Sequence, residues 1–103
     1  MSELSDQLWA MLLEIRGVEE SGSTFSGGVG LWANGTEVAY LRAEHALELR
    51  LTKKTIAQMK RQLKASPGIE VRGASDWITV RFESEDDFEN ILELAEHAVR
   101  AQR

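Results

Sequence analysis

Apolar and polar positions recur along the chain with two different periods, and these periods divide it into helices and strands. Apolar residues at helical spacing predict three helices, over 3–16, 53–65 and 85–101. Alternating or short β-branched and aromatic runs predict five strands, over 24–32, 36–43, 45–51, 69–72 and 77–83. The expected order is therefore α-β-β-β-α-β-β-α.

Turn and cap residues mark where these elements end. Asn34-Gly35 is typical of the tight turn of a hairpin, and Ser66-Pro67-Gly68 ends the central helix. Thr52 and Ser84 are the expected N-caps of the second and third helices. We therefore expect an α+β fold with one antiparallel sheet of about five strands and helices packed mainly on one face.

A chain of 103 residues forms one domain, because it is too short for two independent cores. Residues 1–23 supply the first helix and a joint at Ser21-Gly22-Ser23, and residues 24–101 supply the sheet and two helices.

The predicted sheet has a second face, which the predicted helices are not expected to cover. If Leu47, Leu49, Ile78 and Val80 point to the helices, the residues between them point the other way. The expected binding face then contains Arg50, Trp77 and Arg81, with Trp32 and Tyr40 as further members; the resemblance described below adds Ser75. Tryptophan and arginine are enriched at binding hot spots. The alternative is that Glu48 and the arginines only pair across the strands, with Trp77 over their stems.

The first helix has apolar residues on two sides. Its expected buried stripe is Leu4, Leu8, Met11, Leu12 and Ile15. Trp9 and Leu13 lie off that stripe, four residues apart, and form a second apolar patch. A helix with two apolar sides packs on two surfaces, so this patch is an expected dimer contact.

Composition and charge limit the chemistry. The chain has no cysteine, only two histidines (His45 and His97), and no apolar run long enough for a membrane span. The net charge of −5 argues against a nucleic-acid partner. The basic residues of the central helix are interpreted as a solvated face; they are Lys53, Lys54, Lys60, Arg61 and Lys64. We expect a cytoplasmic protein without contact to a membrane.

No catalytic, cofactor or metal site emerges from the motifs. Gly27-Gly28-Val29-Gly30 lacks the lysine of a phosphate-binding loop. The acids of residues 83–89 are interpreted as first-turn residues that oppose a helix dipole. No nucleophile with an adjacent base can be identified. We therefore expect no metal and no cofactor.

Residues 75–82, Ser-Asp-Trp-Ile-Thr-Val-Arg-Phe, followed by Ser84-Glu85-Asp86-Asp87 and a leucine-rich helix, carry a resemblance. Over residues 24–98 the chain resembles small bacterial proteins labelled as luciferase-domain proteins. Many of them carry a His-x-His element where this chain has Ala39-Tyr40-Leu41. The resemblance therefore carries over Ser75 and Trp77 only. In element order the chain is also similar to small acidic dimeric chaperones of bacterial secretion systems.

Two functions follow as hypotheses. The first is a non-catalytic, chaperone-like interaction module whose partner is a second copy of the chain or another protein. The alternative, which the family resemblance implies, is a small-molecule-binding protein or enzyme with a pocket near Ser75 and Trp77, for which a small anionic ligand is one option.

Overall fold

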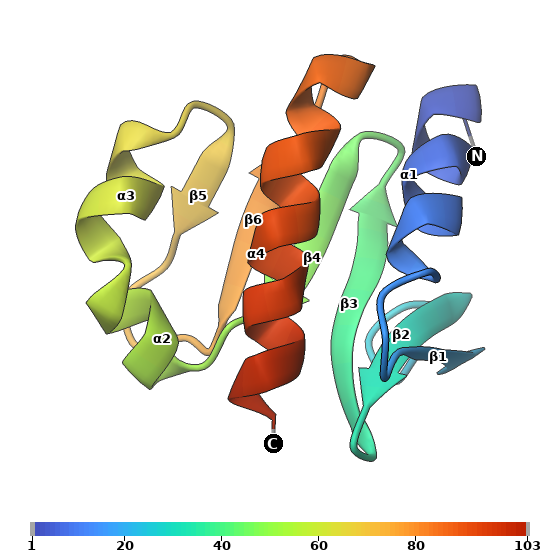
Figure 1. Ribbon diagram of the computed structural model, residues 1–103, viewed down its shortest axis with the longest axis horizontal. Coiled ribbons are helices and arrows are strands. Elements are labelled where there is room, and N and C mark those ends of the chain that lie inside the picture. The colour runs from blue at the N-terminus through green and yellow to red at the C-terminus, as the bar shows by residue number, and fades with distance from the viewer. Residues whose placement is uncertain (1, 103) are drawn as a thin grey trace.

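Six antiparallel strands form one sheet in the computed structural model, which describes residues 2–102. The strands lie in the order β1-β2-β3-β4-β6-β5, so only the last two positions depart from chain order (Figure 1). Their bounds are β1 Glu19–Gly22, β2 Val29–Ala33, β3 Thr36–Ala43, β4 Ala46–Arg50, β5 Ile69–Val71 and β6 Trp77–Arg81.

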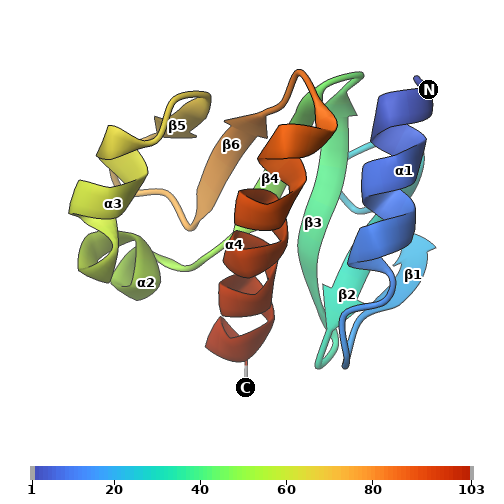
Figure 2. The same cartoon turned by 45° about the horizontal axis from the view of Figure 1, so that its top comes forward.

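The helices cover one face of this sheet. Figures 1 and 2 both show α4 over the middle strands, with α1 beside it towards β2 and α3 beside β5. Their bounds are α1 Glu3–Leu12, α2 Lys53–Gln58, α3 Lys60–Ala65 and α4 Phe88–Ala101, with a short 3-10 helix, η1 Glu85–Asp87, before α4. The other face of the sheet carries no helix of residues 2–102 (Figures 1 and 2).

The core lies between the helices and the sheet. Apolar residues alternate along β4 and β6, so Leu47 and Leu49 of β4 lie beside Val80 and Ile78 of β6 on the helix side. The helices contribute further large buried side chains, which are Leu8, Trp9, Leu12, Ile56, Leu63, Phe88, Ile91 and Leu94. The expected α+β class, with one antiparallel sheet and helices on one face, is confirmed.

The sheet is one strand larger than expected. Residues 19–22 follow the predicted first helix and include part of the predicted joint, but they form the edge strand β1, which pairs from Glu19↔Trp32 to Gly22↔Val29. All four β1 residues are exposed, so the strand has no apolar alternation to reveal it. The next strand begins at Val29 and not at residue 24, because Ser23 to Gly28 form a loop.

Two helix predictions also need correction. The first helix ends at Leu12 and not at residue 16, and its buried face is Ser5, Leu8, Trp9 and Leu12. Met11, expected in the core, is 39% exposed. The helix predicted over 53–65 is divided at Met59, whose backbone angles (φ −101°, ψ 7°) depart from helical values.

The turn and cap predictions are confirmed. Asn34 and Gly35 both have positive φ (53° and 76°), as the hairpin turn between β2 and β3 requires. The Thr52 side chain accepts a hydrogen bond from the backbone N–H of Thr55. Ser84 and Asp87 form a capping box at η1, so an acid of this segment caps backbone N–H groups where a helix begins. No helix within residues 2–102 has the length and apolar character needed to cross a membrane.

Candidate binding surface on the open face of the sheet

Three aromatic rings from separate elements meet on the sheet face that carries no helix. Tyr40 of β3 and Trp77 of β6 lie with ring centroids 5.4 Å apart, at 64° to each other. Phe25, from the loop between β1 and β2, stacks on Tyr40 at 5.7 Å and meets Trp77 edge-on at 5.2 Å. The Arg50 guanidinium lies 4.9 Å from the Trp77 ring centroid. We call these four residues the aromatic surface.

A buried carboxylate positions the loop that carries Phe25. Glu37 is 3% exposed, and its side chain accepts hydrogen bonds from the hydroxyl of Ser23 and, at 2.7 Å, from the backbone N–H of Thr24. The carboxylate fits here because Gly30 on the neighbouring strand has no side chain; a Cβ at that position would collide with it. Glu37 therefore fixes the start of the loop, and Phe25 follows two residues after Ser23.

A second buried carboxylate lies beneath the rings. Glu48 is 2% exposed and is the cross-strand neighbour of both Tyr40 and Thr79. It accepts a hydrogen bond from the hydroxyl of Thr79 and forms an ion pair with Arg72 at 2.7 Å. Arg72 also donates to the hydroxyl of Thr79 at 2.7 Å. Both carboxylate oxygens of Glu48 therefore have a partner, as a carboxylate buried beneath an apolar surface requires.

The phenol of Tyr40 is perturbed by burial and by nearby charges. Burial raises the pKa of Tyr40 above its ordinary value of 10.0, and the negative charge of Glu48 raises it further, whereas the positive charges of Arg72 and Arg42 lower it and Glu37 raises it least. The hydrogen bond to Glu48 raises the pKa of Arg72 in turn. Tyr40 is therefore a neutral hydroxyl group and Arg72 a cation throughout the physiological pH range.

Arg50 is held by stacking. Neither salt bridge within residues 2–102 involves it, and its Nε is a buried donor without a hydrogen-bond partner in that part of the chain. A cation over an indole face is stabilised by roughly 0.5–2 kcal/mol. Arg50 is thus oriented on the aromatic surface with its charge not neutralised by an ion pair.

The structure brings together part of the expected binding face. Tyr40 and Arg50 each contact Trp77 in the aromatic surface. Arg81 is exposed at the far end of β6, where it pairs in register with Ala46. Trp32 lies on β2 beside a separate hollow of about 430 Å³ lined by Glu19, Ser21, Asn34 and their neighbours.

Ser75 has a local structural role. Its hydroxyl accepts a hydrogen bond from the backbone N–H of Trp77 at 3.0 Å. It also lines a hollow of about 230 Å³ beside α2, to which Lys53, Lys60 and Arg72 contribute. Trp77 is not among the residues that line this hollow, so Ser75 and Trp77 do not share it.

Trp9 and Leu13, the expected dimer contact, differ in their exposure in the structure. Trp9 is only 8% exposed, and its indole N–H donates to Glu20 of β1 at 2.6 Å. Leu13 lies just after the end of α1 and is 38% exposed. The indole N–H of Trp9 therefore has its hydrogen-bond acceptor, Glu20 of β1, within the same chain. The self-association that this patch was expected to support is not tested by this burial.

Sequence reasoning missed three residues of the site. Phe25 was placed on a strand with Val29 and Leu31, although the serines and glycines of 21–28 are typical of a loop. Glu37 and Arg72 carry no local signal, because their roles depend on neighbours distant in sequence. Among residues 2–102, no group of three or more potential metal ligands lies close enough to hold a metal ion.

Comparison with known proteins places this geometry in a family. The family model described as "Luciferase domain" matches residues 35–98, which is more than half of the chain. The match includes β3, β4 and β6, and with them Tyr40, Arg50 and Trp77, whereas Phe25 and α1 precede it. No curated protein and no solved structure matches the chain. The chain belongs to the luciferase domain family.

Proposed function

We propose that this protein is a non-catalytic, chaperone-like interaction module that forms a homodimer through the aromatic surface. The observation that carries the proposal is the cluster of Phe25, Tyr40 and Trp77 on the helix-free face, where Phe25 is 51% exposed. An exposed phenylalanine that caps two further rings is apolar area that association would remove from water.

The charges around the rings support a second copy as the partner. The same face presents Arg50 and Arg81, and also Glu70, whose side chain is 52% exposed. In a twofold dimer each surface meets its own copy, so a face with both signs of charge is able to complement itself. Arg50, which has no ion pair within residues 2–102, gains an acidic partner in such a dimer.

The buried carboxylates support a binding role over a catalytic one. Glu37 is engaged by Ser23 and Thr24, and Glu48 by Thr79 and Arg72. A general base needs a lone pair directed at its substrate, whereas these carboxylates hold loop and strand in place. Their hydrogen bonds restrain the loop and strands that carry the surface, and such restraint lowers the entropic cost of association.

Sedimentation equilibrium tests the proposal. The untagged protein is expected to sediment as a dimer whose mass falls towards that of the monomer on dilution. Phe25→Ser should weaken dimerisation about tenfold or more, because it removes the exposed ring of the cluster. Val29→Ser is the matched control, since Val29 is 42% exposed but lies outside the aromatic surface. A monomer at all concentrations, or equal effects of both variants, would refute the proposal.

A second candidate function is the binding of a small anion in the hollow beside Ser75. Two lysines and an arginine line it, and its volume of about 230 Å³ suits a ligand of a few atoms. Titration of inorganic phosphate, followed by backbone amide NMR, should then shift resonances of Gly73 to Ser75. Lys60→Gln should reduce the shift, and Lys64→Gln, which does not line the hollow, should not. Without a saturable shift this candidate is rejected.

A further inference from the structure

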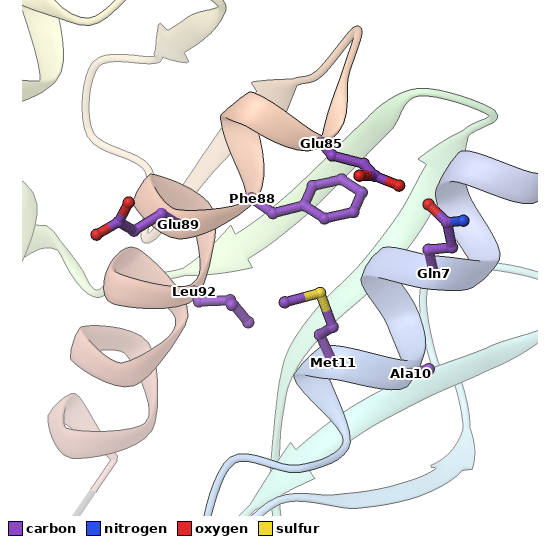
Figure 3. Close-up of a pocket in the computed structure, with 7 residues that line it drawn as sticks. All are labelled: Gln7, Ala10, Met11, Glu85, Phe88, Glu89 and Leu92. Carbon is purple, nitrogen blue, oxygen red and sulfur yellow. The ribbon is translucent and has the colours of Figure 1, made fainter.

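A second surface lies on the helical side of the molecule, opposite the aromatic surface. It is a groove of about 700 Å³ between α1 and α4 (Figure 3). The lining residues come from both helices and from η1; they are Gln7, Ala10, Met11, Glu85, Phe88, Glu89 and Leu92. The groove uses no residue of the proposed dimer surface.

The floor of the groove is apolar. Figure 3 shows the side chains of Met11 and Leu92 extending towards each other from the two helices, with the Phe88 ring beside them. Phe88 is 4% exposed and belongs to the core, whereas Met11 is 39% exposed. The groove thus joins the core to the surface through a flexible methionine, a side chain that adapts to different apolar partners.

The rim and surroundings of the groove are acidic. Figure 3 shows Glu85 above the Phe88 ring, and Glu89 on the side of α4 away from α1. Over 3–12 and 85–101 the acids are Glu3, Asp6, Glu85, Asp86, Asp87, Glu89, Glu93 and Glu96, against one arginine, Arg100, and no lysine. No salt bridge of residues 2–102 neutralises any of these acids. The groove therefore lies in a negative potential.

We propose that this groove binds a basic amphipathic helix of a partner protein. A helix laid between α1 and α4 would place apolar side chains on Met11, Phe88 and Leu92, in the helix-in-groove mode of recognition. Lysines or arginines beside that apolar stripe would meet Glu85 and Glu89. The same acids disfavour an anionic membrane as the occupant.

A second copy of this chain does not fit the groove equally well. Its basic helices are α2 and α3, and their apolar residues Ile56 and Leu63 are 7% and 0% exposed in their own core. A folded copy therefore offers basic side chains without the apolar stripe that the groove requires. The charge and the apolar floor together specify a partner with a free amphipathic helix.

The proposal is tested with a fluorescent model peptide and the full-length protein. The probe is a leucine and lysine peptide of about 15 residues with leucine at helical spacing, long enough to form a helix on binding. Fluorescence anisotropy at physiological salt should show saturable binding. A peptide of the same composition, with leucines scattered around the helix, should bind at least about tenfold more weakly. Equal binding of both peptides would overturn the proposal.

Two surface variants locate the binding. Met11→Lys should weaken binding about tenfold or more, because it places a charge on the floor and repels the probe. Leu13→Lys is the matched control, since Leu13 is 38% exposed and does not line the groove. Circular dichroism checks that both variants are folded. If Leu13→Lys and Met11→Lys weaken binding equally, the groove is not the site.

The acidic rim is tested separately. Glu85→Gln combined with Glu89→Gln should weaken binding and reduce its salt dependence, whereas Glu93→Gln on the same helix should have a smaller effect. Sedimentation of the peptide complex gives a further outcome. If the peptide releases a monomer from a dimer, the groove is the surface between copies and a foreign helix is not its partner. Retention of the dimer mass supports the proposal.

Discussion

The carboxylate of Glu37 occupies the space that a side chain at Gly30 would need. A Cβ built on Gly30 would overlap with Oε2 of Glu37 and lie 3.2 Å from the carbonyl oxygen of Ala39. This close approach of two strands allows Glu37 to bind Ser23 and Thr24. The absence of one side chain on β2 therefore positions Phe25 on the aromatic surface.

Gly30→Ala should destabilise the protein by about 1–3 kcal/mol, because the displaced carboxylate loses its hydrogen bonds and remains buried. Urea denaturation measures the change in the free energy of unfolding. Gly22→Ala is the control, since a Cβ there meets no atom within 4 Å. If both variants change stability equally little, the position of the Glu37 carboxylate does not depend on the missing side chain at Gly30.

Arg72→Met should destabilise the protein by about 1–3 kcal/mol, since it leaves Glu48 buried without its cation. The cost falls below that of a fully buried pair because the Arg72 side chain is 37% exposed. Denaturation of the single and double variants with Glu48→Gln gives the coupling energy of the pair. Glu70→Gln, which removes the weaker contact of 3.4 Å, should change stability by less than about 0.5 kcal/mol. A coupling energy near zero would contradict the role of the ion pair.

Tyr40 is expected to ionise above its ordinary pKa of 10.0. It is the only tyrosine of the chain, so the ultraviolet absorbance of tyrosinate reports this residue alone. The folded state holds the phenol proton more tightly than the unfolded state does. The resulting stabilisation is present below pH 10 and is lost as the pH rises through the folded pKa.

Tyr40→Phe should therefore make the free energy of unfolding less dependent on pH in the alkaline range than it is in the wild type. The comparison of the two proteins removes the contributions of lysines that titrate there as well. A tyrosinate transition at or below the ordinary value would contradict the burial of Tyr40 between Glu48 and Glu37.

Trp9→Ala should destabilise the protein by about 3–5 kcal/mol, because the indole is part of the core. Leu13→Ala, at a side chain that is 38% exposed, should change stability by less than about 1 kcal/mol. Thermal denaturation of both variants measures the difference. Similar small effects would restore the view that both residues form one exposed patch.

The elements that could be predicted from sequence are those with one buried face. In β4, Leu47 and Leu49 alternate with polar residues, and a similar alternation occurs in β6. Both patterns predict strands, and the two strands pair in the structure. The turn at Asn34-Gly35 is predictable because positive φ at both positions selects those residues. The fold class follows from these local signals.

The missed features depend on contacts between distant parts of the chain. The edge strand β1 is exposed along its length, so only its pairing with β2 identifies it. Burial of Trp9 depends in turn on β1, which supplies Glu20. In the binding face, the alternation placed Tyr40, Arg50 and Trp77 together, but Phe25 reaches them through a loop whose position is set by Glu37.

The most direct test of the proposed dimer uses the indole N–H resonances of the three tryptophans. Trp77 lies in the aromatic surface, whereas Trp9 donates to Glu20 inside the chain. On dilution of isotope-labelled protein, the Trp77 resonance should shift as the dimer dissociates, and the Trp9 resonance should stay in place. A Trp77 resonance that does not change across the range of concentrations would contradict self-association through the aromatic surface.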